Sequence, residues 1–191
     1  PFYLMYYVDF FTGLRESELI GLTWDCIDFA KGTIRVYRQF VRIASGPDKG
    51  KMMFTSLKNH KERTIHPAPS VMEALRQAKE KQNRQRLVAG SSWDNVYDMV
   101  FTRDNGMFIR FKTLCVEFNA LIAKLTHPTV RSHHLRHTYA TLAIQSEIDF
   151  KTLSLSLGHA TVAFTLDTYG HVSNRMSQNA ADKMEKFIGT L

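Results

Sequence analysis

Three short segments of the chain carry the residue types of an anion-binding reaction centre. Arg15 lies in TGLRESEL, His133 and Arg136 lie in SHHLRHTYAT, and His159 and Tyr169 lie in LGHATVAFTLDTYGHV. A guanidinium stays protonated near neutral pH and presents forked N–H donors that match the oxygens of a phosphate. Two arginines can therefore hold two oxygens of one phosphate without a metal ion.

The spacing in the second segment indicates where such an anion would bind. His133 lies three residues before Arg136, which puts both on one helix face near the helix N-terminus, where the backbone dipoles favour an anion. His133 and His137 are also four residues apart, but the residues between them include an arginine and lack the glutamate of a zinc protease box. We therefore expect no metal ion, and a structural role for His137.

The composition leaves the partner open. The chain has 25 Lys and Arg against 18 Asp and Glu, a formal charge of +7, which suits a polyanion but does not separate nucleic acid from a membrane surface. No apolar run approaches the roughly 20 residues of a membrane span. Cys26 and Cys115 form no C-x-x-C pair, which predicts two buried, reduced thiols and a cytoplasmic location.

The elements that must position these segments follow from the apolar periodicity. A nearly continuous apolar stretch predicts a buried helix over Phe2–Phe11, and RESELIGL predicts a second helix after Gly13. The alternation in DCIDF and TIRVYRQFVRI predicts strands. We expect FTSLK and RTIHP to form another hairpin, and VFTRDNGMFI to form a short strand, a turn and a return.

The remainder of the chain predicts helices. Strong helix formers with a narrow apolar side follow Pro69, and helical patterns return from Phe111 to the C-terminus. The expected fold is therefore α+β, a mostly helical domain with a small antiparallel β-sheet.

Together the three chemical segments resemble the signature of the tyrosine recombinase (phage integrase) family. That signature has a first arginine in T-G-x-R-x-x-E, an H-x-L-R-H box, and L-G-H followed by a tyrosine, and the matches lie in the family's order across nearly the whole chain. The resemblance implies the catalytic domain, with the family's fold, of a site-specific DNA recombinase or integrase of a phage or mobile element. Such an enzyme cleaves and rejoins double-stranded DNA through a 3′-phosphotyrosyl intermediate.

The resemblance also implies residue roles. Tyr169 would be the nucleophile, and the DNA phosphate would be bound by Arg15, Arg136 and His159. A phenol with a pKa near 10 needs a proton acceptor and a positive field, and we assign His133 as that acceptor. The covalent link keeps the bond energy of the phosphodiester, so no cofactor is expected.

A lysine is also implied, to protonate the leaving 5′-oxygen. LKNHKERTIHP resembles the family's K-x-x-K-E-R-x-x-P hairpin, in which the first lysine is catalytic. We therefore assign Lys58, whose compact and mobile ammonium suits this task. Lys61 is interpreted as a solvated turn charge.

Each assignment has a plainer alternative. Arg15 could be a surface arginine paired with Glu18 at i,i+3. Tyr139 and Tyr169 could both be core aromatics, which is the more typical role for Tyr139. Lys58, like Lys61, could be a solvated turn charge. We expect Glu18 to orient an arginine or to cap its neighbourhood rather than to transfer protons.

At the level of domains, we expect residues 1–191 to be one catalytic domain with a tail helix over 171–191. The N-terminal DNA-binding domain that family members usually carry is absent from it. The full-length protein would assemble into a tetramer on DNA, without any membrane partner. Two alternatives to a recombinase are a catalytically silent DNA-binding module and an enzyme that relaxes DNA as a topoisomerase does.

Overall fold

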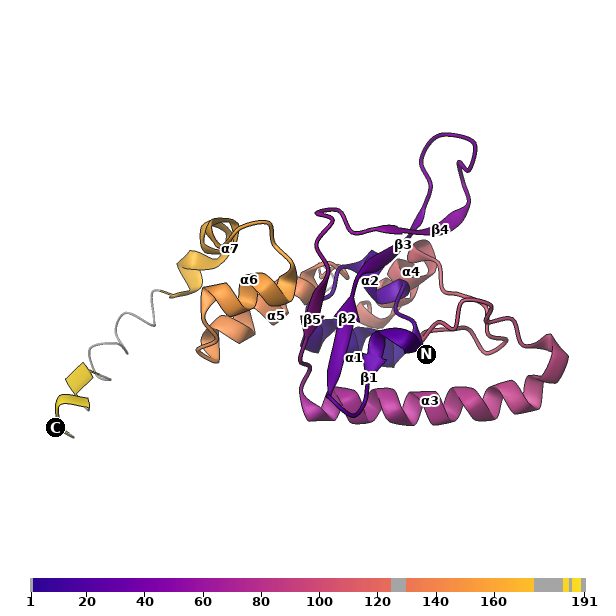
Figure 1. Ribbon diagram of the computed structural model, residues 1–191, viewed down its shortest axis with the longest axis horizontal. Coiled ribbons are helices and arrows are strands. Elements are labelled where there is room, and N and C mark those ends of the chain that lie inside the picture. Colours follow the sequence, from indigo (N-terminus) through magenta and orange to yellow (C-terminus); the bar gives the residue numbers. More distant parts are fainter. Residues whose placement is uncertain (1, 125–129, 174–183, 186, 190–191) are drawn as a thin grey trace.

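The computed structural model describes residues 2–124, 130–173, 184–185 and 187–189. Figure 1 shows two lobes side by side. The sheet lobe contains the strands with helices α1 to α4, and the helical lobe contains α5, α6 and α7. Elements from the N-terminal half of the chain therefore meet elements from the C-terminal half along one junction.

Two helices open the sheet lobe, as predicted. α1 spans Phe2–Thr12 and α2 spans Glu16–Ile20. Gly13 separates them with a φ of 60°, a conformation that favours glycine, and a Cβ there would clash with the ring of Tyr139 in the helical lobe. The break before Arg15 thus allows close contact between the two lobes.

The strands form two antiparallel sheets. β1 (Ile27–Asp28), β2 (Thr33–Val36) and β5 (Arg63–Ile65) are ordered β1-β2-β5. β3 (Arg38–Arg42) pairs only with β4 (Met52–Ser56) in the described residues. The antiparallel α+β class with dominant helices is confirmed.

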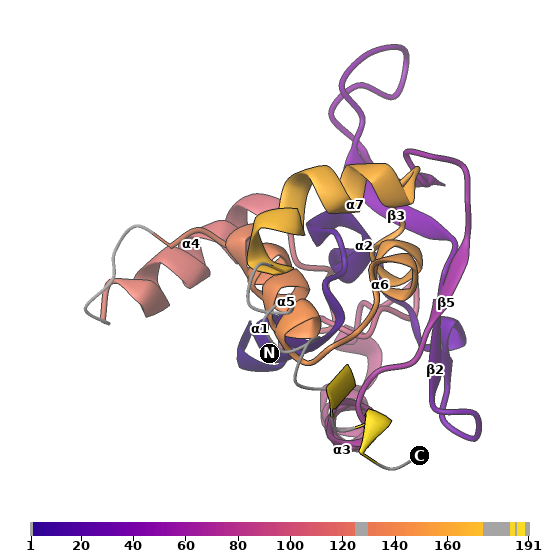
Figure 2. The same cartoon turned by 90° about the vertical axis from the view of Figure 1, so that its left-hand side faces the viewer.

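The predicted hairpin of FTSLK with RTIHP is wrong. Residues 52–56 pair with 38–42, while residues 63–65 pair with 34–36. The predicted long strand is interrupted at Tyr37, so its two halves take separate partners. The connection from β4 to β5 leaves the β3–β4 sheet and reaches towards the helical lobe, as Figures 1 and 2 show. The strand and return strand predicted for VFTRDNGMFI are not formed as paired strands. The two sides of the turn meet only at one isolated bridge, between Thr102 and Phe108.

The core of the sheet lobe lies between the strands and helices α1 and α3. α3 spans Pro69–Ala89 and buries only a narrow side, as predicted. Its buried Gln82 accepts a hydrogen bond from the indole N–H of Trp24 at 2.7 Å and donates to the carbonyls of Met99 and Val100. Trp24 begins a 3-10 turn, η1 (Trp24–Cys26), and a second 3-10 turn, η2 (Gly90–Ser92), follows the end of α3.

The remaining helices are α4 (Phe111–Ile122), α5 (His134–Gln145), α6 (Phe150–Leu157) and α7 (Val162–Tyr169). A short η3 turn (Gly170–Ser173) follows. The helical lobe has its own small core, formed by Ala140, Ala143, Ile144, Leu153, Leu157 and Tyr169. Most of the predicted tail helix over 171–191 lies outside the described residues.

Two composition-based expectations are also resolved. Cys26 and Cys115 are both free thiols, but only Cys26 is buried; Cys115 is partly exposed. Across the described ranges, the longest and most apolar helices still fall short of what a membrane crossing requires.

Asp9 is a buried acid of α1 with incomplete hydrogen bonding. The residue is 2% exposed, and its Oδ1 has no hydrogen-bond partner among the described residues. Burial, and then the charge of Glu16, raise the pKa of Asp9 well above 3.8; Arg136 acts in the opposite direction and Glu18 adds to the increase.

Replacing Asp9 by Asn is expected to raise the unfolding midpoint at pH 7. Because the pKa of Asp9 is raised by folding, the stability of the protein falls as pH rises from 3.8 through the folded pKa. A neutral amide of the same shape removes this loss. Thermal unfolding measured across pH checks this expectation. The gain in unfolding midpoint should vanish near about pH 3, where the Asp9 carboxyl is neutral in both the folded and the unfolded protein. A variant less stable than the parent at pH 7 would contradict the expectation.

Candidate active site

Arg15 lies at the N-terminal boundary of α2, directly after the break between the first two helices. Its backbone N–H donates to Oε2 of Glu18 at 2.9 Å, and its Nη1 donates to Oε1 at 2.9 Å. Its Nη2 reaches across to the carbonyl of Gly158 at 2.7 Å. The i,i+3 pair considered as an alternative is therefore present, but the same guanidinium also joins the two lobes.

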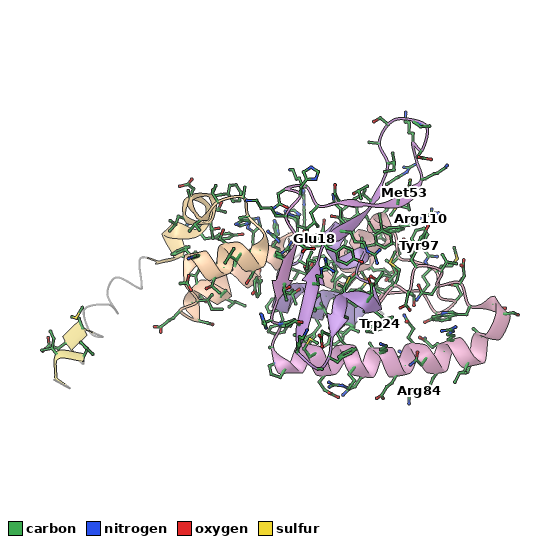
Figure 3. The ribbon with its side chains drawn as sticks, viewed as in Figure 1. Glu18, Trp24, Met53, Arg84, Tyr97 and Arg110 are labelled. Carbon is green, nitrogen blue, oxygen red and sulfur yellow. The ribbon has the colours of Figure 1, made fainter. Side chains whose placement is uncertain are left out.

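Glu18 is the buried centre of this contact. Its side chain is 1% exposed, and Figure 3 shows it at the junction of the two lobes. Arg63 from β5 donates to both of its oxygens, at 3.1 and 2.6 Å. Burial alone would raise the pKa of Glu18, but the hydrogen bonds and charges of Arg63 and Arg15 outweigh it and hold the pKa below 4.5. Glu18 orients an arginine, as predicted.

The carbonyl groups at the carboxyl end of α6 accept hydrogen bonds from other parts of the site. The last carbonyl groups of a helix lack intrahelical partners and carry the negative end of the helix dipole. Here the carbonyls of Ser156–Gly158 accept hydrogen bonds from Arg63 (2.7 Å), Arg136 (2.8 Å), Arg15 (2.7 Å) and Asn59 (3.1 Å). Three separate parts of the chain are thereby held at one helix end.

Arg136 is the second predicted arginine, in the first turns of α5. Besides its bond to Leu157, it donates to the carbonyl of Gly13 at 2.5 Å. Burial, and then repulsion from Arg15, lower the pKa of Arg136 to about 10. This value still leaves the guanidinium protonated at neutral pH, so both arginines present positive charge to the junction.

His159 follows the left-handed Gly158 that ends α6. Its Nδ1 forms a 2.8 Å hydrogen bond with the hydroxyl of Thr165 on α7. Burial, and then the charges of Arg136, Arg15 and Arg63, lower the pKa of His159 to about 4. Its imidazole is therefore neutral at pH 7 and contributes hydrogen bonds rather than charge.

His133 lies at the N-cap position of α5 and is exposed. It borders a pocket of about 170 Å³ whose other lining residues are Asp9, Leu14, Arg15, Glu16 and Arg136. His133 and both arginines are thus brought to one hollow. Within the described residues, no group of three or more His, Cys, Asp or Glu side chains could hold a metal ion.

Tyr169 ends α7 and is 4% exposed. Its hydroxyl forms a 2.8 Å hydrogen bond with Nδ1 of His137 rather than with His133. Burial raises the pKa of Tyr169 above 10.0, although the charge of Arg136 acts in the opposite direction. His137, expected to be structural, is therefore the histidine that contacts the phenol, a distinction that spacing alone could not make.

Lys58 lies exposed in the turn after β4, with no hydrogen bond or ion pair to any described residue. The adjacent Asn59 bonds the carbonyl of Gly158, which brings the turn to the carboxyl end of α6. Lys61 is also exposed, as predicted. The sequence interpretation missed Arg63 and Asn59; Arg63 was visible only as one letter of the K-E-R pattern.

The model of the phage integrase family matches residues 3–176, so the chain belongs to this family. The tyrosine recombinase XerC-like protein of Caldanaerobacter subterraneus subsp. tengcongensis is 29% identical over 187 residues, 94% of this chain and 48% of that protein. The ICEBs1 integrase of Bacillus subtilis is 27% identical over 193 residues, 98% of this chain and 49% of that protein. The chain thus spans about half the length of these relatives.

Solved structures show the same fold. The Tn1549 transposon integrase, in complex with transposon right end DNA, superposes with a TM-score of 0.77 at 22% identity. The match covers 96% of this chain and 58% of that one. The fold is that of a tyrosine recombinase catalytic domain.

Replacing Glu18 by Gln is expected to lower the free energy of unfolding by about 3–5 kcal/mol, because it leaves Arg63 buried without its counterion. Denaturant unfolding measures this. The matched control is Glu62→Gln, which breaks the exposed pair of Glu62 with Arg35 of β2 (60% and 59% exposed) and should change stability little. Equal losses in the two variants would contradict the central place of Glu18.

His159 is expected to titrate near pH 4 in the folded protein, well below its ordinary 6.5. Its charged form is disfavoured by burial and by three neighbouring guanidiniums, so protonation occurs only as pH falls far below neutral. NMR titration of the ring signals provides the measurement. A midpoint at 6.5 or above would show that the ring does not lie beside these charges.

Proposed function

We propose that this chain is the catalytic domain of a site-specific DNA recombinase of a mobile element. It cleaves and rejoins double-stranded DNA through a covalent bond between Tyr169 and a 3′-phosphate. The observation that carries this proposal is the meeting of Arg15, Arg136 and His133 at one hollow. His159 lies beside the carboxyl end of α6, whose carbonyls accept hydrogen bonds from both arginines. The membership in the phage integrase family supports it.

The arginines bind the scissile phosphate. Each guanidinium has five N–H donors, and Arg15 and Arg136 each use some of theirs on protein acceptors. Those contacts fix the planes of the two groups, and the remaining donors hold the non-bridging oxygens. Negative charge grows on these oxygens in the pentacoordinate transition state, where preorganised positive charge is most effective.

The hydrogen bond between His159 and Thr165 orients the imidazole. When the Thr165 hydroxyl donates to Nδ1, the ring proton is on Nε2, from which it is donated to a phosphate oxygen. A neutral ring suits this role because a cation between two arginines would be repelled.

The covalent step exchanges one phosphorus–oxygen bond for another. The Tyr169 oxygen bonds to phosphorus, the bond from phosphorus to the 5′-oxygen breaks, His133 takes the phenol proton and Lys58 protonates the leaving oxygen. Rejoining is the reverse, so neither cofactor nor metal is consumed. The Tyr169 hydroxyl is hydrogen-bonded to Nδ1 of His137, and this hydrogen bond must break before the phenol attacks the phosphate.

Site-specific recombination joins two DNA sites, and the full-length protein acts as a tetramer on DNA in the cytoplasm. The chain alone binds DNA weakly, and this binding weakens further as salt rises because phosphate contacts release counterions. Lys58 and the sheet-lobe turn that carries it face the DNA.

A suicide-substrate assay with the full-length protein tests the proposal. Such a substrate loses a short strand after cleavage, so the covalent adduct accumulates, and peptide mapping should place it on Tyr169. Tyr169→Phe should abolish the adduct. The matched control is Tyr139→Phe, a partly buried tyrosine beside the same small core, which should retain it. Adducts that persist in Tyr169→Phe would contradict the proposal.

The same assay separates the two alternatives. DNA binding without any adduct in the parent protein would indicate a silent binding module. Adduct formation with supercoil relaxation at a single site, and no product from two sites, would indicate a topoisomerase-like enzyme.

A further inference from the structure

Arg63 lies in the site without reaching its open side. Its side chain is 8% exposed. Nη1 and Nη2 form a fork on the two oxygens of Glu18, and Nε donates to the carbonyl of Ser156 at 2.7 Å. All three nitrogens of this guanidinium are hydrogen-bonded to protein groups, and the side chain has no exposed face for a substrate. Any effect of Arg63 on the reaction must therefore act through Glu18 or the carboxyl end of α6.

The first partner, Glu18, creates an electrostatic problem for the reaction. The same carboxylate holds Arg15 through the backbone and the side chain. A buried carboxylate beside a single arginine cancels that arginine's charge, and the pair would attract a phosphate poorly. With Arg63 present, the cluster of Arg15, Glu18 and Arg63 has two positive charges and one negative charge, so these three groups keep a net charge of +1.

The second partner is the carboxyl end of α6. Besides the bond to Ser156, the guanidinium packs against Gly158, where an added Cβ would lie 2.8 Å from Nη1. Gly158 has a φ of 65°, and the next residue is His159. Arg63 therefore contacts both the acceptor that orients Arg15 and the segment that presents His159.

We propose that Arg63 is a positioning residue of the reaction: it neutralises Glu18, so that Arg15 is oriented by this carboxylate and still keeps its charge for the phosphate. The inference rests on the proposed function. If the Arg63–Glu18 pair were purely structural, it would hold the same segments together, but the cleavage rate would not depend on the net charge of Arg15 and its partners. This difference provides the test.

The test compares single-turnover cleavage of a suicide substrate, at saturating full-length protein, in Arg63→Gln and in the double variant Glu18→Gln/Arg63→Gln. The single variant leaves Arg15 paired with Glu18 at zero net charge. We expect its cleavage rate to fall by about 10–100-fold, the usual effect of losing a partner of a reactive group. The double variant restores the net charge of +1 with two neutral amides, and it should recover part of that loss and cleave faster than Arg63→Gln.

Three controls keep the result interpretable. Arg35→Gln removes the same charge from the exposed pair on the neighbouring strand and should cleave like the parent. Arg63→Lys keeps the charge without the fork and should cleave at a rate between those of the parent and Arg63→Gln. If Arg63→Gln fails to fold, the rates of Arg63→Lys and of the double variant are compared with the rate of the parent instead. Circular dichroism and affinity for uncleavable DNA, measured for every variant, separate unfolding and weak binding from slow chemistry.

The outcomes are distinct. Recovery in the double variant supports the proposal. A double variant no faster than Arg63→Gln, or an Arg63→Gln protein that is folded and cleaves like the parent, would overturn it while leaving the proposed function intact. A parent protein that forms no adduct at all would overturn both.

Discussion

The buried carboxylate of Glu18 is the contact on which the rest of the site depends. It takes four hydrogen bonds from two arginines that lie 48 positions apart in the sequence, Arg15 and Arg63. An ionised carboxylate inside a protein is tolerated only when its charge and its lone pairs are satisfied. Because both partners supply charge and donors together, the chain before α2 and the strand β5 are held at one place.

The second constraint is the carboxyl end of α6. A short helix whose last carbonyls point into the junction requires donors from elsewhere, and the structure supplies guanidiniums for Ser156–Gly158. The helical lobe is thus joined to the sheet lobe through Arg15 and Arg136, the two arginines that would bind a phosphate, and through Arg63. Fold and function share these groups: Arg136 also bonds to Gly13, at the break between α1 and α2. Preorganisation of the arginines is therefore a direct consequence of how the lobes meet.

The sequence predicted which segments meet at the candidate site better than it predicted the pairing of the strands. The three segments around Arg15, Arg136 and His159 were recognisable because their residue types and order are specific, and the structure brings them together. The pairing of β4 and β5 was predicted wrongly because a strand pattern shows which residues alternate and not which strand is the partner. The interruption at Tyr37, which separates the partners, has no local signal.

The roles of Arg63 and His137 were hidden for a similar reason. Arg63 becomes important only because Glu18 is buried opposite it, and burial of a glutamate cannot be read from TGLRESEL. His137 is one of three histidines in SHHLRHTYAT, and only the placement of α7 decides that it meets Tyr169. Contacts between segments depend on packing, which a motif does not contain.

The most direct measurement is a crystal structure of the protein bound to nicked duplex DNA with vanadate in place of the scissile phosphate. Vanadate adopts the pentacoordinate geometry of the transition state. We expect its equatorial oxygens to be bound by Arg15 and Arg136, with the Tyr169 oxygen in an apical position and no longer hydrogen-bonded to His137. Vanadate bound away from these arginines, or coordinated by a group other than Tyr169, would contradict it.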